Sequence, residues 1–139
     1  MYRRIIPGQQ RLDLPFGVEL RTDNRWVQYA RLIPWEKIEE QYSANYKEVK
    51  GQVAKPSRLA FGALFIQWRL GLTDDETVEQ IRENPSIQFF CGFENYTIEK
   101  PFDSSLMVHF RKRITAKMMK EITEEAFAAE AKKTLKDED

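Results

Sequence analysis

The chain of 139 residues is 42% hydrophobic and 32% charged, which is enough for one compact domain with its own core and too little for two ordinary domains. No run of about 18 apolar residues occurs, and residues 1–7 lack the apolar stretch of a secretory signal, so we exclude a membrane span and expect a cytoplasmic protein. Lysines and arginines number 22, as do aspartates and glutamates, so the total charge neither favours nor excludes a polyanionic partner.

The first 23 residues are expected to form an extended arm. Prolines and glycines interrupt every helical or strand period there, with a small hairpin in residues 12–22 as the alternative. The arginines of this region suit a DNA minor groove or phosphates, although a solubilising tail explains them equally well. The breakers are Pro7, Gly8, Pro15 and Gly17, and the arginines are Arg3, Arg4, Arg11, Arg21 and Arg25.

Two short helices are predicted next. Asn24 suits an N-cap, and Pro34 stops the first helix at residue 33. The second helix begins at Trp35 and fades before residue 51, with its glutamates in water, and residues 47–55 follow as a loop. The core-facing positions are predicted from their helical spacing to be Trp26, Ala30 and Ile33 in the first helix, and Ile38 and Tyr42 in the second.

Residues 56–70 predict a buried central helix. Pro56 suits a first helical turn, Gly71 suits a C-terminal stop, and nearly every side of the segment between them is apolar. From their helical spacing, the three tryptophans at positions 26, 35 and 68 are expected in the core. We prefer this to a platform for stacking nucleic-acid bases, which would need the tryptophans to point outward from a sheet.

Residues 73–84 should form the next helix, because Thr73 and Glu76 fit a capping box. The acidic residues 74–76 are then a first turn favoured by the helix dipole, which we prefer to a metal site. One more short turn of helix is expected over residues 86–92, where Cys91 is an inert core residue, and residues 95–101 form a loop. With one cysteine and one histidine, His109, the chain has too few ligands for the usual zinc site.

A helix over residues 105–113, capped by Asp103 or Ser104, has an apolar arc and a basic, polar arc. Such a helix can enter a DNA major groove when a tight helix-turn-helix-like pair precedes it. Base-edge contacts are assigned to four residues and phosphate contacts to two, and a merely solvated basic face is the alternative. The inner arc is Leu106, Met107, Phe110 and Ile114; the base-edge residues are Ser105, Val108, His109 and Lys112; the phosphate residues are Arg111 and Arg113.

The last predicted helix begins at residue 116 and carries an apolar stripe in 3-4-3 spacing, formed by Met119, Ile122, Ala126 and Ala129. Residues 136–139 should be mobile. With no confident strand, the predicted fold is all-α: a compact helical bundle with a helix-turn-helix-like DNA-binding unit. Its parts are the arm (1–23), a helical DNA-binding core (24–115), and a connecting helix with its tail (116–139).

The balanced total charge hides alternating segments. Residues 1–72 hold 12 basic and 7 acidic side chains, and residues 73–102 hold 2 and 7. Residues 103–115 hold 3 and 1, and residues 116–139 hold 5 and 7. Because charges more than about 8 Å apart are screened at physiological salt, the basic segments can still attract phosphates locally.

Several segments together resemble a known family. They are NRWV at 24–27, LIPW at 32–35, GLTD at 71–74, VEQIRENP at 78–85, QFF at 88–90, PFDSSL at 101–106 and FRKRI at 110–114. Their order and spacing over about residues 2–125 resemble the N-terminal domain of bacterial insertion-sequence transposases of the insertion-sequence-five type. The resemblance implies that the 103–114 helix belongs to the DNA-recognition part, used on the terminal inverted repeats of the mobile element.

Full-length members of that family carry an RNase H-like catalytic domain with a DDE carboxylate triad and two divalent metal ions. The 139 residues contain no strand-rich half to hold such ions about 3.5–4 Å apart. We therefore expect no catalytic residue, no metal ligand and no cofactor in this chain, and no strand cleavage. His109 has no neighbouring nucleophile and is expected to be an exposed polar contact.

The sequence thus predicts a DNA-binding and assembly domain of a transposase, with double-stranded DNA as partner, possible self-association, and neither a small-molecule substrate nor a membrane. The alternative is a protein-interaction module for dimerisation or inhibition, supported by the stripe in the last helix. An unrelated enzyme lacks any nucleophile, phosphate-loop or metal signature. With about 3–5 phosphates neutralised, log K should fall against log salt with a slope of about −3 to −4, and replacing both Arg111 and Arg113 with Ala should flatten it.

Overall fold

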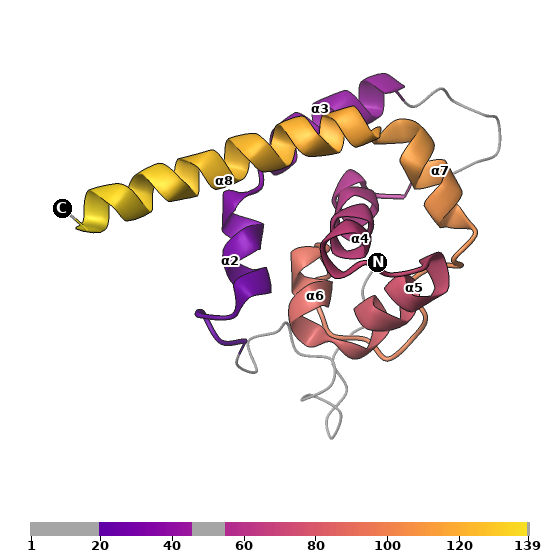
Figure 1. Cartoon of the computed structure of the whole chain (residues 1–139). Helices are drawn as coiled ribbons and strands as arrows, with labels where there is room; N and C mark the ends of the chain where they lie inside the picture. Colours follow the sequence, from indigo (N-terminus) through magenta and orange to yellow (C-terminus); the bar gives the residue numbers. More distant parts are fainter. Residues whose placement is uncertain (1–19, 46–54, 139) are drawn as a thin grey trace.

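The computed structural model describes residues 20–45 and 55–138, with side chains up to Phe127 and Ala128 in the last helix. This part of the chain forms helices and contains no strand, so the all-α prediction is confirmed for it (Figure 1). The helices are α2 (Arg25–Leu32), α3 (Trp35–Asn45), α4 (Ser57–Leu70), α5 (Asp74–Glu83), α6 (Pro85–Phe90), α7 (Leu106–Arg113) and α8 (Ala116–Glu138).

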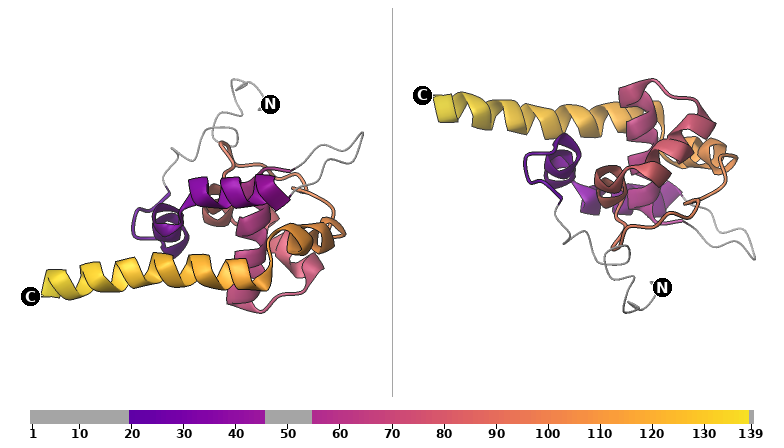
Figure 2. Two further views of the ribbon diagram at one scale, coloured as in Figure 1. Left: turned by 90° about the horizontal axis from the view of Figure 1, so that it is seen from above. Right: turned by 90° about the horizontal axis from the view of Figure 1, so that it is seen from below.

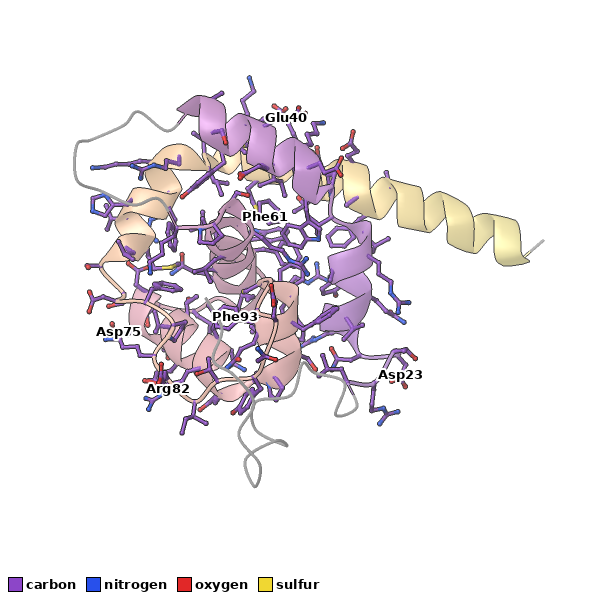
Figure 3. All side chains as sticks on the ribbon, turned by 180° about the vertical axis from the view of Figure 1, so that it is seen from behind. Asp23, Glu40, Phe61, Asp75, Arg82 and Phe93 are labelled. Atoms are coloured by element: carbon purple, nitrogen blue, oxygen red, sulfur yellow. The ribbon has the colours of Figure 1, made fainter. Side chains whose placement is uncertain are left out.

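Helix α4 is the centre of the molecule, with the other helices arranged around it (Figures 1 and 2). Every residue from Leu59 to Ile66 is buried, as its all-round apolar sequence predicts. Phe65 packs among aromatic rings from four helices. Its ring centroid lies 5.3–6.2 Å from those of Trp26, Tyr29, Phe61, Phe90 and Phe127. Figure 3 shows Phe61 among the inner side chains, while Glu40 and Asp75 lie at the outside.

Trp68 corrects one prediction, because 58% of its surface is exposed rather than buried in the core. The residues of α4 after Ile66 are half-buried or exposed. Only the inner side of the indole meets the core, through Phe65 at a centroid distance of 5.8 Å. Trp26 is buried and Trp35 is half-buried, so those two tryptophans do belong to the core.

The predicted helix boundaries are confirmed where polar caps fix them. The Asn24 side chain accepts hydrogen bonds from the amides of the first turn of α2. Thr73 and Glu76 form the reciprocal capping box at the start of α5. Gly71 ends α4 with a left-handed φ of 66°, a conformation that glycine adopts without steric cost. Asn84 ends α5 and caps α6.

A buried glutamine fixes the connection between α6 and α7. The side chain of Gln88 is fully buried. Its amide nitrogen donates to the carbonyls of Arg82 and Thr97 at 3.0 and 2.8 Å, and its oxygen accepts from the Thr97 amide at 3.0 Å. Residues 95–101 form the predicted loop, and this clamp ties the loop to α5 and α6. Together with the hydrogen bond from the Arg82 guanidinium to the Ile98 carbonyl at 2.9 Å, this clamp positions the segment that leads into α7.

The long helix α8 packs on the core with its first half only. Met118, Ile122 and Ala126 are buried there, and Lys37 of α3 lies 3.4 Å from Glu125. Of the predicted apolar stripe, Ile122 and Ala126 are buried, and Met119 is half-buried and packs against the core. The side chain of Ala129 lies outside the described residues. From about residue 128 the helix extends past α2, away from the other described helices (Figures 1 and 2).

Some predictions fall largely outside the described residues. These are the arm of residues 1–19, most of the alternative hairpin, and most of the 47–55 loop. Residues 20–23 of the arm lead into α2 through a turn, closed by a hydrogen bond from the Asn24 amide to the Arg21 carbonyl. Among the described helices, none is both long and apolar enough to cross a bilayer. Whether the end of α8 is mobile stays a prediction.

Candidate nucleic-acid interface

Helix α7 has the two faces that its sequence predicts. Met107, Phe110 and the following Ile114 are buried, and Leu106 is half-buried. Phe110 packs edge-on against Phe102 at 5.2 Å between centroids. This inner face holds α7 against the core, and α7 contacts α4 directly. The orientation of the helix is therefore fixed by burial of its apolar arc.

The outer face of α7 presents an apolar, an aromatic polar and a cationic side chain to solvent. Val108 is 45% exposed, and His109 and Lys112 are exposed as well. These side chain types suit the edges of DNA bases. Valine can contact the methyl group of thymine, and histidine and lysine can donate hydrogen bonds to the acceptor atoms of purines. Three of the four predicted base-edge residues thus lie free on one outward face.

Ser105, the fourth predicted base-edge residue, is exposed but already engaged. Its hydroxyl donates to the Asp103 carboxylate at 2.6 Å, and its amide donates to the same carboxylate oxygen at 3.0 Å. These two hydrogen bonds and the Lys100 ammonium hold the pKa of Asp103 below its ordinary value. Asp103 therefore orders the turn before α7. The N-cap position of α7 is Ser105, and the Ser105 side chain makes no capping hydrogen bond to the helix.

Arg111 is the predicted phosphate contact whose surroundings matter most. Its guanidinium makes a two-pronged ion pair with Asp74, at 2.8 and 3.0 Å, and donates to the Gln67 side-chain oxygen at 3.1 Å. Gln67 also donates to Asp74 at 2.7 Å. Such two-pronged pairs are among the stronger charge-assisted hydrogen bonds. An acidic residue of α5 thus holds this cation beside the α7 face.

The ion pair shifts the proton affinity of both groups. The hydrogen bond from Arg111 lowers the pKa of Asp74, and the same bond raises the pKa of Arg111 above its ordinary value. A carboxyl with a depressed pKa stabilises the fold above its ordinary pKa, and that contribution is lost as the pH falls through the depressed value. The pair is therefore intact at neutral pH, when phosphate would compete for the arginine.

Arg113, the second predicted phosphate contact, lies half-buried at the end of α7. Its guanidinium donates to the carbonyl of His109 one turn earlier, at 3.2 Å. A basic side chain in the last turn complements the helix dipole, and here it adds a side-chain hydrogen bond to the carbonyl. The end of α7 is thus stabilised by this arginine.

Two cations that the sequence interpretation did not assign lie just beyond α7. Only Ile114 and Thr115 separate α7 from α8, and the Thr115 hydroxyl accepts from the Met118 amide at 3.2 Å to cap the new helix. Lys117 and Lys120 in the first turns of α8 are exposed. The sequence could have indicated these two lysines, because a connection of two residues keeps the basic start of α8 close to the basic end of α7.

The described arginines of the predicted arm and its border have partners within the fold. Arg21 pairs with Asp23 at 2.7 Å, and the Arg25 guanidinium lies 5.2 Å from the centre of the Trp26 ring. Arg3, Arg4 and Arg11 lie outside the described residues. The pairing of Arg21 with an acid leaves less of its charge for a phosphate.

The residues weighed for chemistry behave as core or surface. Cys91 is buried, and desolvation raises the pKa of its thiol well above the ordinary value, so it is not a nucleophile at neutral pH. Residues 74–76 begin α5, with Thr73 as its cap. In the described part of the chain, no three His, Cys, Asp or Glu side chains gather as metal ligands would.

The tight helix pair before α7 is α5 and α6, which meet at Asn84. Residues 91–105 then separate α6 from α7, so α7 is not the second helix of a short two-helix turn. The closely joined helices around the candidate face are instead α7 and α8. Whether any of these pairs acts as a helix-turn-helix unit on DNA stays a prediction.

Comparisons with known proteins support a relation to transposases. Residues 16–113 match the family model described as Transposase domain (DUF772). The chain is also 40% identical, over 96 residues, to a Rhizobium meliloti protein described as uncharacterized protein ORF8 in nfe locus. That alignment covers 69% of this chain and 46% of the relative, so the chain spans about half of the relative's length. No solved structure matches significantly.

Proposed function

Because the chain belongs to the Transposase domain (DUF772) family, we propose that it is a DNA-binding and assembly domain that recognises the terminal inverted repeats of an insertion sequence. The observation that carries the proposal is the outward face of α7, where Val108, His109 and Lys112 are exposed on a helix whose inner face is buried. A helix anchored in this way can enter a major groove without disturbing the core.

Within this proposal, the side chains of α7 have separate tasks. Val108, His109 and Lys112 read base edges, and Ser105 joins them when its hydroxyl leaves Asp103. Arg111 and Arg113 contact phosphates. Arg111 does so only by exchanging Asp74 for a phosphate, since the two anions would compete for one guanidinium. Binding needs no metal or other cofactor, and the domain itself does not cut DNA.

The alternative role, a protein-interaction module, loses one of its supports. The stripe proposed for dimerisation in α8 includes Ile122 and Ala126, which are buried against the domain's own core. Those two residues of the stripe are therefore unavailable to a second copy. The cationic, exposed outer face of α7 favours DNA binding as the primary role, and a different surface for self-association is considered below.

The test is a binding titration with a duplex of the adjoining inverted repeat and a shuffled duplex, at two salt concentrations. We expect a slope of log K against log salt of about −3 to −4. His109→Ala or Lys112→Ala should reduce the preference for the repeat by about 1–3 kcal/mol each. Arg31→Ala, at an exposed arginine of α2 on the other side of α4, is the matched control and should change little. Equal binding to both duplexes by the unmodified chain would reject the proposal.

Asp74→Asn should strengthen DNA binding, because it removes an anion near the interface and releases Arg111 to a phosphate. One added phosphate contact steepens the salt slope by about 1, and we expect affinity at low salt to rise about three- to tenfold. The measurement is the same titration.

The neighbouring change Asp75→Asn controls for the loss of one negative charge in the same helical turn. It should raise affinity less, because the Arg111 pair remains intact. Adding Arg111→Ala to Asp74→Asn should abolish most of the gain. If the double variant kept the full gain, Arg111 would have no part in phosphate contact.

A further inference from the structure

An apolar groove runs along the first half of α8. Its volume is about 830 Å³, and it lies between α8, the last turns of α4 and the end of α7. Trp68 on one wall is 58% exposed, and Met119 and Phe127 on the other are half-buried. Exposed tryptophans in apolar depressions are typical of residues that dominate binding between proteins. The groove has the form that accepts an amphipathic helix.

The second half of the same helix lies beside no other described helix (Figure 2). Helix α8 has 23 residues and is about 35 Å long. Residues 116–127 line the groove, and residues 128–138 extend past α2 away from the other described helices (Figure 2). The free half therefore has nearly the same length as the grooved half.

We propose that two copies of the chain associate through antiparallel α8 helices, each free half lying in the groove of the other copy. A two-fold axis near Phe127 places residues 128–138 of each copy along residues 116–127 of the other. Both grooves are then filled, and the assembly closes as a dimer. In sequence, the free half offers Ala131 and Leu135, four and eight residues after Phe127. These positions extend the face of α8 that lines the groove, with Leu135 at its edge.

Charge selects the antiparallel arrangement. The first turns of α8 carry Lys117 and Lys120, next to the basic end of α7, whereas its last turn carries Asp137 and Glu138. In an antiparallel pair the acidic end of one helix meets the basic start of the other, and the helix dipoles also oppose each other favourably. A parallel pair would place like charges side by side.

The surface of α8 used here differs from its core-facing stripe. Ile122 and Ala126 point into the domain's own core, whereas Met119, Thr123 and Phe127 line the groove. Self-association through the groove therefore leaves the monomer intact. Val108, His109 and Lys112 of α7 lie outside the groove and stay open, whereas Arg111 lines it.

Sedimentation of the full chain over a range of concentrations, without DNA, tests the groove. Trp68→Ser should raise the dimer dissociation constant at least about tenfold, because it truncates the most exposed aromatic side chain of the groove. Ile98→Ser is the matched control, since Ile98 is 63% exposed but lies in the loop before α7, outside the groove. It should leave self-association unchanged. A chain that stays monomeric at about 1 mM would overturn the proposal.

A charge exchange tests the antiparallel arrangement. One variant carries Lys117→Glu and Lys120→Glu, and the other carries Asp137→Lys and Glu138→Lys. Each alone should dimerise about tenfold more weakly, because like charges then meet at both ends of the pair. An equimolar mixture should recover the affinity, since each acidic start then faces a basic end. Variants that dimerise like the unmodified chain, or a mixture that fails to recover, would contradict this arrangement.

Discussion

Replacing Phe65 with alanine should lower the free energy of unfolding by about 3–5 kcal/mol, as is usual for a buried phenylalanine. Phe65 is fully buried at the centre of α4 and touches aromatic rings from α2, α4, α6 and α8. Because a domain of this size is stable by only about 5–15 kcal/mol in total, the variant should lose a large part of its stability. Urea denaturation followed by helical circular dichroism measures the change.

The matched control is Trp68→Ala, three residues later on the same helix. It removes a larger aromatic side chain, but one that is 58% exposed, so its cost should stay below about 1.5 kcal/mol. If both variants lost equal stability, the core would extend to the end of α4. The pair thus separates burial from side-chain size.

The same two residues show what the sequence could predict of the fold. The apolar residues of α4 identify a central helix, and capping residues such as Asn24 and Thr73 fix where its neighbours begin. Periodicity assigns a residue to a face but does not say how far the neighbouring helices reach along it. Trp68 is on an apolar helix yet exposed, because it faces the groove beside α8, while Gln67 and Arg69 of the same turn contact Asp74 and Tyr29.

For the candidate site, the sequence predicted the outward residues of α7 but not their partners. The exposure of Val108, His109 and Lys112 follows from the helical period together with three buried positions opposite. The pairing of Arg111 with Asp74 joins residues 37 positions apart and depends on how α5 packs beside α7. No local pattern contains that information. The ion pair instead arises from tertiary packing, and it is the feature that bears most on phosphate binding.

The structure also explains how α7 is held in place for binding. Its inner face is fixed by Met107 and Phe110, and its end is joined closely to α8. Its start follows residues 91–105, which form turns and irregular backbone and contain no helix. Such a connection has high conformational entropy unless hydrogen bonds order it. Gln88 supplies three such bonds from the rigid side of the domain.

Gln88→Leu should therefore lower the free energy of unfolding by about 3 kcal/mol. The change keeps the side-chain volume similar but leaves the amide and carbonyl of Thr97 and the carbonyl of Arg82 without their buried partner, and each such loss costs about 1–3 kcal/mol unless water replaces it. Amide hydrogen exchange should also become faster in residues 95–101, because the loop is no longer tied to α6.

Gln28→Leu, at an exposed glutamine of α2, is the control for the change of side chain and should alter stability by less than about 0.5 kcal/mol. The proposed DNA-binding role adds a second readout. At temperatures where it is still folded, the Gln88→Leu variant should bind the repeat duplex more weakly than the unmodified chain, because the start of α7 is less well ordered. Unchanged exchange in residues 95–101 would show that the loop is ordered without this glutamine, and α7 would then owe its orientation to its buried face alone.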